Sequence, residues 1–249
     1  MTRKPEVSIV MAYHDRKEQV ITTLKSIEKS KHANAIEVII VDDASSLEHS
    51  LQEVVENSSL HIKLIEIKKS EKWWINPCVP YNMGFKEATA DRIIIQNPEC
   101  AHYGDIIDKT IEHLTDDNYL SFHCYSLNAA DTTEYQKTGN VIFFPRGTIA
   151  DGTSGFYNHY VYKRTALHFT SAISKSNLDK LGGFDEVYAY GIGYDDNDLI
   201  RRVAQMGLSI QFVENPLSIH QYHYSDSTVL LGTDKGALLH HNMLIYNKK

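Results

Sequence analysis

Apolar runs and helical patterns alternate along the first half of the chain. Short apolar runs typical of buried strands cover residues 7–11, 36–41, 62–67 and 92–96. Amphipathic or helix-favouring stretches separate them, at residues 17–29, 47–55 and 80–90, the last with Pro80 in its first turn. This alternation predicts βαβ units and a largely parallel sheet.

The second half is less regular. We expect strands over residues 119–126, 141–144 and 209–214, and helices over residues 176–181 and 198–206. Residues 146–162 are rich in Gly, Ser, Thr, Tyr and Asn and predict a long loop. Because no internal repeat or low-complexity linker interrupts the chain, we expect one domain over residues 1–249.

Size and charge narrow the class of protein. A chain of 249 residues with 42% hydrophobic and 23% charged residues can bury the core of one α/β domain. Its formal net charge of -7 includes no block rich in Lys and Arg, which argues against nucleic acid as a partner. A nucleotide remains compatible, because a metal ion and a few backbone amides can carry its phosphates.

The cysteines and the apolar segments predict the compartment. Cys78, Cys100 and Cys124 are odd in number and form no C-x-x-C pair, which argues against a disulfide scaffold or a zinc ribbon. We expect reduced thiols in a cytoplasmic protein. Neither a signal peptide nor an apolar run of about 18 residues is present. We therefore expect a soluble protein with at most peripheral membrane contact.

Polar clusters follow three of the expected strands, at residues 12–16, at Asp42 and Asp43, and at residues 97–99. Ligands of open parallel sheets bind beyond the carboxyl ends of the strands. A single turn carboxylate is often a cap, but three clusters at one edge predict a ligand site. Asp42 or Asp43 could accept hydrogen bonds from a base or ribose. Glu99 could ligate a hard cation that bridges a diphosphate.

The usual phosphate-binding loops are missing from the sequence. No G-x-G-x-x-G follows the first expected strand, and G-x-x-x-x-G-K-[ST] occurs nowhere. This argues against NAD enzymes and P-loop NTPases. A nucleotide would have to be held by side chains and a metal ion.

A glycine-rich acidic segment is the most specific local signal. It reads GGFDE at residues 182–186 and GIGYDDND at residues 191–198. Its glycines let the backbone approach a ligand closely, and its acids lie at the start of a helix. Capping explains one such acid but not three. One carboxylate among acidic neighbours could have a raised pKa and act as general base toward a hydroxyl.

Histidines and tryptophans add weaker signals. His220 and His223 follow the last expected strand, and either could complete a metal site with Glu99. With 13 histidines in the chain, a surface role is nearly as plausible for each. The pair Trp73–Trp74 could stack on a sugar or base, or pack in the core.

In this order, four segments resemble the family 2 glycosyltransferases of GT-A fold, over residues 7–223. These segments are VSIVMAYHDR, IIVDDAS, PYNMGFKEATADRIIIQNPE and GGFDE…GIGYDDNDLIRR. The last also resembles the C-terminal motif of galactosyl- and N-acetylgalactosaminyltransferases. The resemblance implies a single Rossmann-like, mostly parallel sheet flanked by helices. It also implies a nucleotide-sugar-binding half at residues 1–115, an acceptor-binding half at residues 116–225 and a tail at residues 226–249.

For the donor, the resemblance implies that Tyr13 lies at the nucleotide base, that Asp42 or Asp43 binds uracil or ribose, and that Asn82 contributes to the same site. Where the family usually has D-x-D, this chain has Asn97-Pro98-Glu99, so Glu99 alone aligns with the metal ligand.

For the reaction, the resemblance implies that Asp195 and Asp196 match the family's acidic pair near the acceptor, with Asp196 as the catalytic base. His220 or His223 matches a late metal-binding histidine. The implied chemistry is transfer from a UDP-sugar to a hydroxyl of a glycan or other acceptor, with Mn²⁺ or Mg²⁺ and inversion at the anomeric carbon. Closure of residues 146–162 would help to exclude water.

Two other interpretations stay open. A nucleotidyltransferase would need a basic, Gly-rich loop after the first strand, and residues 12–17 contain no glycine. A non-catalytic nucleotide- or carbohydrate-binding module fits the missing D-x-D, although Asp195 and Asp196 argue against it. The sugar is also open: the last motif suggests galactose, and glucose and N-acetyl sugars remain.

Overall fold

The computed structural model describes residues 4–148, 153–223 and 234–249. The strands are β1 (Val7–Tyr13), β2 (Ile36–Asp42), β3 (Ile62–Glu66), β4 (Arg92–Gln96), β5 (Cys100–Tyr103), β6 (Asn118–Ser126), β7 (Gly155–Asn158), β8 (Thr170–Ser174) and β9 (Ser209–His220). The α-helices are α1 (Lys17–Ile27), α2 (Gln52–Glu56), α3 (Cys78–Glu87), α4 (Ile106–His113), α5 (Ala129–Thr138), α6 (Lys175–Leu181), α7 (Asp195–Gln205) and α8 (Lys235–Tyr246). The short 3₁₀ turns are η1 (Ala33–Ala35), η2 (Leu47–His49) and η3 (Glu186–Tyr188). Among these residues, no helix is long and apolar enough to cross a membrane.

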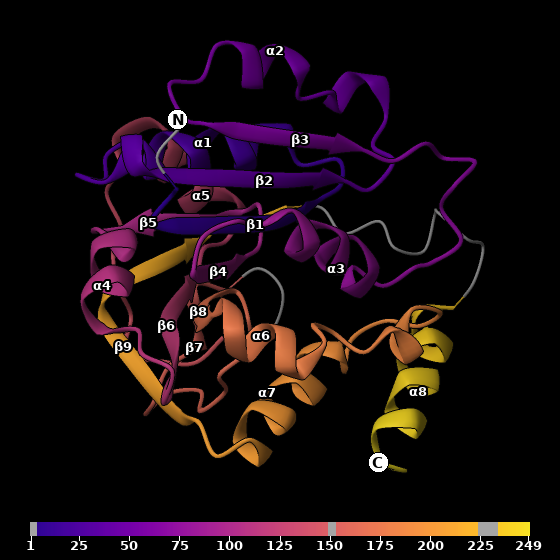
Figure 1. The fold of residues 1–249 in the computed structure, drawn as a ribbon. Coiled ribbons are helices and arrows are strands. Elements are labelled where there is room, and N and C mark those ends of the chain that lie inside the picture. Colours follow the sequence, from indigo (N-terminus) through magenta and orange to yellow (C-terminus); the bar gives the residue numbers. More distant parts are fainter. Residues whose placement is uncertain (1–3, 149–152, 224–233) are drawn as a thin grey trace.

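One sheet runs through both halves of the described chain in the order β3-β2-β1-β4-β8-β6-β9-β5, with β7 paired to β6 (Figure 1). β1 is parallel to β2 and β4, and β2 is parallel to β3. β8 then joins the two halves, antiparallel to both β4 and β6. The α/β class with a mostly parallel, Rossmann-like sheet is confirmed. The carboxyl ends of β1, β2 and β4 therefore lie at one edge.

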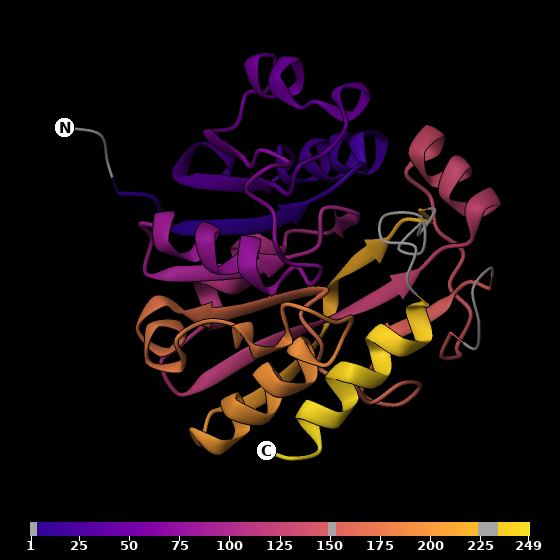
Figure 2. The ribbon, with the colours of Figure 1, turned by 90° about the vertical axis from the view of Figure 1, so that its right-hand side faces the viewer.

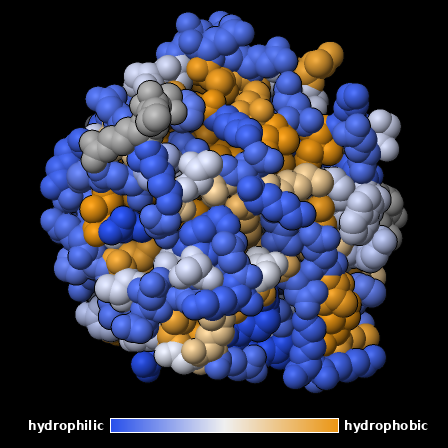
Figure 3. Space-filling view, in the orientation of Figure 1, coloured by the Kyte–Doolittle hydropathy of each residue, from blue (hydrophilic) through white to orange (hydrophobic). Residues whose placement is uncertain are grey.

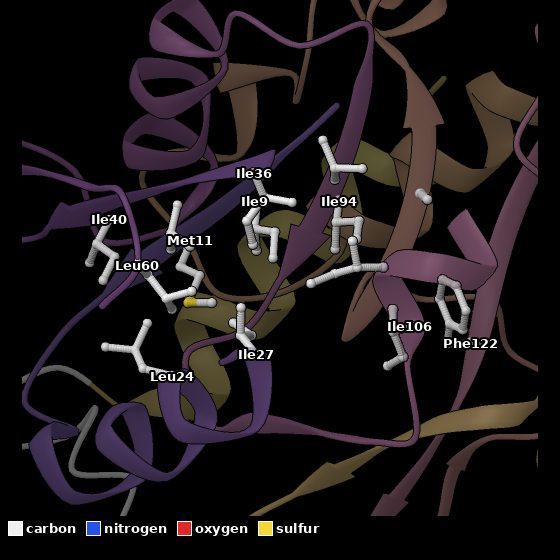
Figure 4. Close-up of a cluster of buried hydrophobic side chains, with 14 of the residues drawn as sticks. Ile9, Met11, Leu24, Ile27, Ile36, Ile40, Leu60, Ile94, Ile106 and Phe122 are labelled. Atoms are coloured by element: carbon white, nitrogen blue, oxygen red, sulfur yellow. The ribbon is translucent and has the colours of Figure 1, made fainter. Parts of the chain in front are cut away.

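The sheet lies between two helical layers (Figure 2). Successive residues of a strand face opposite sides, so Ile9 and Met11 of β1 pack with α1 and α4 (Figure 4). Val10, between them, packs on the other side with α3, α6 and α7. Such residues are fully buried, and each contributes about 1.5–3 kcal/mol through burial. These two cores fix the strands whose ends carry the candidate site.

Most first-half elements appear where the apolar pattern predicts them. β4 covers the expected residues 92–96, and α3 begins two residues before Pro80. The predicted helix over residues 47–55 is divided into η2 and α2.

Some second-half predictions are wrong. Residues 141–144 form no strand: their backbone is held by the Tyr125 hydroxyl, which donates to Ile142 O (3.2 Å) and accepts from Phe144 N (3.0 Å). The predicted loop over residues 146–162 contains β7, because Phe156 packs against Tyr125 (ring centroids 4.9 Å apart) and pairs with β6. Residues 149–152 of that loop lie outside the described residues. α7 begins at Asp195 rather than at residue 198, and β9 continues to His220.

The C-terminal tail divides into two parts. Residues 226–233 lie outside the described residues, and most of the rest forms α8. Figure 3 shows an apolar area over this helix, where Leu239 and Leu244 are exposed. Its inner face carries the buried Asn242, whose Nδ2 donates to Gly193 O (2.8 Å) and Tyr188 O (3.1 Å). α8 therefore supports the glycine-rich segment that precedes Asp195.

Two adjacent glycines allow a matched test of that segment. Gly182 and Gly183 both have left-handed backbone, with φ of +73° and +74°. A Cβ on Gly182 would meet nothing within 4 Å, but one on Gly183 would lie 2.3 Å from Asn82 Oδ1. We expect Gly182→Ala to lower the free energy of unfolding by about 1 kcal/mol and Gly183→Ala to lower it by about twice that or more. Urea denaturation would measure both, and equal losses would contradict the packing argument.

Candidate active site

The ends of β1 and β2 form one wall of the site. Tyr13 and Asp42 are register partners, and Asp43 N donates to Tyr13 O (2.8 Å). Tyr13 is fully buried, and its hydroxyl donates to His49 O (2.7 Å). The structure thus brings Tyr13 together with the two acids, with its hydroxyl engaged by the protein.

The two acids of this wall have different surroundings. Asp42 Oδ1 accepts a hydrogen bond from Ser45 N (2.9 Å), which closes the turn after β2. Asp43 accepts from Lys72 Nζ and from Trp74 Nε1, both at 2.8 Å. Burial raises the pKa of Asp43, although Lys72 and Trp74 favour its charged form. The Trp74 indole is therefore structural, whereas Trp73 remains half exposed.

Glu99 lies at the centre of a second cluster, just beyond β4. Its Oε1 is 3.3 Å from His220 Nε2 and 3.6 Å from His223 Nε2, and the three ligand atoms lie within 4.8 Å of one another. The antiparallel pairing of β5 with β9 makes this contact, because Cys100 pairs with His220. The sequence left His220 and His223 as alternatives, and the structure brings both to Glu99.

Arg16 compensates the charge of this buried carboxylate. Its Nη1 donates to Glu99 Oε2 (2.7 Å), on the oxygen that does not face the histidines. Burial alone would raise the pKa of Glu99, but Arg16 and then the two histidines outweigh it and hold the pKa well below its usual value. Glu99 is therefore ionised and ready to bind a cation.

The Glu99 cluster fits a divalent metal ion. One carboxylate oxygen and two imidazole nitrogens are a ligand set that Mn²⁺ and Zn²⁺ accept. The nitrogen of His220 that faces the cluster is Nε2. Its Nδ1 is buried without a hydrogen-bond partner among the described residues. Within the described residues, no other group of three such side chains was found.

The acids at the start of α7 have three separate environments. Asp195 is buried and accepts a hydrogen bond from Asn76 Nδ2 (2.9 Å). Asp196 is partly exposed and accepts from Asn197 N (2.8 Å). Asp198 is buried and ion-paired with the arginines that follow it, at 2.6 Å from Arg201 Nη2 and 2.7 Å from Arg202 Nε. Asp198 is thus structural.

Only the first two of these acids have a raised pKa. Burial, and then the negative charge of Asp196, raises the pKa of Asp195 to about 6. Burial also raises the pKa of Asp196, against the backbone N–H of Asn197. By contrast, Arg201 and Arg202 outweigh burial at Asp198 and lower its pKa. A carboxylate with a raised pKa has one of the properties of a general base.

Asn82 occupies a different position from the other residues predicted at the donor. Its Nδ2 donates to Phe184 O (2.9 Å) and Glu186 Oε1 (3.0 Å), and its Oδ1 accepts from Phe184 N (2.8 Å). Asn82 therefore fastens α3 to the GGFDE turn. It also lines a surface hollow of about 350 Å³ beside Gly182, whose lining includes neither Glu99 nor Asp196.

Tyr81 joins the two ends of the site. Its hydroxyl donates to Asn97 Oδ1 and Gln96 O, both at 2.9 Å, beside Glu99. Its ring packs against Phe184 in the GGFDE turn, with centroids 5.3 Å apart. Tyr81, Arg16 and Asn76 were not predicted as site residues from the sequence, although Tyr81 and Arg16 lie within the segments that carried the resemblance. Their contacts span 15 to 119 residues along the chain, which no local pattern reports.

Comparisons with known proteins identify the family of the chain and show structures that share its fold. The family described as "Glycosyltransferase like family 2" matches residues 7–231. None of the curated proteins matches the sequence.

Solved structures share the fold at low identity. A mannosyltransferase, PcManGT from Pyrobaculum calidifontis, in complex with GDP-Man and Mn²⁺, aligns with a TM-score of 0.56 at 15% identity, over 88% of this chain and 57% of that one. S. aureus TarS 1-349 in complex with UDP-GlcNAc aligns with a TM-score of 0.62 at 15% identity, over 90% and 60%. Its complex with UDP aligns with a TM-score of 0.60 at 15% identity, over 97% and 69%. The chain thus spans about three fifths of the length of these proteins.

Proposed function

The chain belongs to the family 2-like glycosyltransferases, and we propose from its site that it is a metal-dependent, inverting enzyme that moves a sugar from a UDP-sugar to an acceptor hydroxyl. The observation that carries this proposal is the pairing of Glu99 with both His220 and His223 at one end of a site whose other end holds Asp195 and Asp196. Two complexes named above support it: PcManGT with GDP-Man and Mn²⁺, and TarS 1-349 with UDP-GlcNAc.

In the proposed donor site, Asp42 or Asp43 accepts hydrogen bonds from the base or ribose beside Tyr13. Glu99, His220 and His223 hold Mn²⁺ or Mg²⁺, which when bound supplies positive charge to the departing diphosphate. Arg16, on the other oxygen of Glu99, adds a fixed positive charge to the same end. Asn82 acts on this donor site indirectly, through the GGFDE turn that it holds.

In the proposed reaction, Asp196 takes the proton from the acceptor hydroxyl as its oxygen attacks the anomeric carbon. The bond from that carbon to the diphosphate breaks, and a single displacement inverts the configuration. Asp195 and Asn76 hold the start of α7 in place and keep negative charge beside the base. Whether the sugar is galactose, as the last motif suggests, stays a prediction.

Release of nucleotide from the donor tests the proposal. The protein would be incubated with UDP- and GDP-sugars and Mn²⁺ without acceptor, beside Asp196→Asn and a chelator-treated sample. Slow release of UDP from one donor, lost in both controls, is the expected result. If no nucleotide is released and none stabilises the protein against heat in the presence of Mn²⁺, the proposal fails and a non-catalytic binding module becomes the better description.

The pH profile gives an independent check on the base. Because the pKa of Asp195 is raised to about 6 and that of Asp196 is raised with it, the pair takes up a proton at higher pH than solvated carboxylates do. We expect the acid limb of kcat/KM for donor turnover to lie at a higher pH than a solvated carboxylate would give, with a fall of roughly tenfold per pH unit below it. An acid limb near pH 4 would show that the base is an ordinary, solvated carboxylate elsewhere.

A further inference from the structure

His168 lies just before β8, against a fixed aromatic wall. Its ring makes edge contacts with Tyr81 (centroids 5.2 Å apart, 83° between planes) and with Phe184 (5.0 Å, 70°). Tyr81 and Phe184 are buried, the first held by its hydroxyl and the second by the amide of Asn82. The imidazole therefore has a defined position without needing a hydrogen bond of its own.

Neither nitrogen of His168 has a hydrogen-bond partner among the described residues. The side chain is 8% exposed, and Nδ1 is fully buried without a hydrogen-bond partner among the described residues. Nε2 is not among the fully buried atoms, so it reaches the small exposed part of the ring. Buried polar groups nearly always have a partner, and a ring left open in this way points to a ligand.

A buried histidine of the core offers a comparison. His102 on β5 is buried to a similar degree, but its Nε2 lies 2.8 Å from Gln96 Oε1. Burial lowers the pKa of His102 to about 4, so the ring is neutral and structural. Over the described part of the chain, His168 has no such protein partner, which separates it from His102.

His168 lies between the two ends of the site. The residue after it, Phe169, accepts a hydrogen bond from Asn97 N (3.0 Å), and its ring is 5.8 Å from that of His220. On the other side, Asp195 acts on His168: burial lowers the pKa of the imidazole, while Asp195 and then Glu99 oppose that shift. The ring is thus within electrostatic reach of both carboxylates.

A transferred sugar must occupy this interval. Its anomeric carbon is bonded to the diphosphate, which needs the Glu99 end, and is attacked by a hydroxyl activated at the Asp196 end. Along the aromatic wall formed by Tyr81 and Phe184, the imidazole of His168 is a polar group to which no described residue offers a hydrogen bond.

On the basis of the proposed function, we propose that His168 binds a hydroxyl of the donor sugar through its imidazole and so discriminates among UDP-sugars. A neutral imidazole has one donor and one acceptor nitrogen, and a hydroxyl can donate or accept, so either tautomer makes this bond. His168 is thereby a donor-specificity residue that takes no proton in the reaction.

Binding of UDP and of UDP-sugars separates this role from a structural one. Isothermal titration calorimetry would compare UDP, UDP-glucose, UDP-galactose and UDP-N-acetylglucosamine, each with Mn²⁺. For the sugar that the wild-type protein binds best, we expect His168→Leu to weaken binding about 5- to 10-fold and to leave UDP binding within about twofold. His168→Gln, which keeps a hydrogen-bonding group, should recover part of the loss. His102→Leu, at the hydrogen-bonded histidine on β5, should lower Tm without a selective loss.

The outcomes distinguish the two proposals. An equal weakening of UDP and UDP-sugar binding by His168→Leu would overturn the specificity role and leave His168 as a packing residue. Unchanged binding of every ligand would overturn it as well. If the wild-type protein binds no nucleotide in the presence of Mn²⁺, the proposed function itself fails and this inference fails with it.

Discussion

Asp196→Asn is expected to lower kcat for donor turnover by about 10²–10⁴-fold while UDP-sugar binding stays within about twofold. The amide of asparagine has nearly the same shape as the carboxylate and can still accept the hydrogen bond from Asn197 N. It cannot take a proton from an attacking hydroxyl. Because the acceptor is not needed for this measurement, release of UDP to water reports kcat, and calorimetry reports donor affinity.

The neighbouring acids of α7 are matched controls for this substitution. Asp198→Asn leaves Arg201 and Arg202 without the buried carboxylate that they share, so we expect Tm to fall by several degrees. Asp195→Asn keeps a hydrogen-bonding group opposite Asn76 and should affect kcat less than Asp196→Asn. If Asp195→Asn is the more damaging of the two, Asp195 rather than Asp196 is the base.

The apolar pattern predicted the first half of the fold well because the strands there are recognisable from their local sequence. β1, β2 and β4 are buried on both faces, so their sequences read as continuous apolar runs with polar residues at the ends. The second half depends on distant contacts. β7 forms because Phe156 packs on β6, and residues 141–144 are held by a tyrosine hydroxyl, neither of which is visible in local periodicity.

In the candidate site, too, some residues were predictable from the local sequence and some contacts were not. Tyr13, Asp42, Asp43 and Glu99 could be picked out from the sequence because each lies at or shortly after the end of a recognisable strand. The contact of Glu99 with His220 and His223 spans more than 120 residues and depends on the antiparallel pairing of β5 with β9, which was not predicted. The role of Asn82 was beyond sequence reasoning for the same reason, since its partners lie over 100 residues away.

The charge balance at Glu99 leads to a second large effect. Glu99 carries one negative charge, Arg16 neutralises it, and the histidines bind a metal ion only when they are neutral. A divalent cation therefore enters a site with almost no net negative charge, and needs the diphosphate to complete its neutralisation. We expect the wild-type protein to bind Mn²⁺ weakly alone and much more tightly with UDP.

Glu99→Gln should remove this behaviour. An amide oxygen is a neutral and weaker ligand than a carboxylate, so we expect Mn²⁺ binding in the presence of UDP to weaken by about 10²-fold or more. Donor turnover should fall in parallel. Electron paramagnetic resonance of free Mn²⁺ would measure the binding directly. If Glu99→Gln binds Mn²⁺ with UDP as tightly as the wild type, the cluster of Glu99, His220 and His223 is not the metal site.

Arg16→Met is the informative partner of that substitution, because it keeps the carboxylate and removes only the opposing charge. The arginine side chain is 29% exposed and Glu99 only 2%, so removing Arg16 leaves a buried, uncompensated carboxylate, whereas removing Glu99 leaves a guanidinium that water can reach. Without metal, Arg16→Met should therefore lower Tm more than Glu99→Gln does.

Mn²⁺ alone should bind Arg16→Met about tenfold more tightly than the wild type, because the repulsion from Arg16 is gone. It should also restore much of the Tm that this variant loses. Mn²⁺ should not stabilise Glu99→Gln. If Mn²⁺ leaves the Tm of Arg16→Met unchanged, Arg16 and the metal ion do not share Glu99.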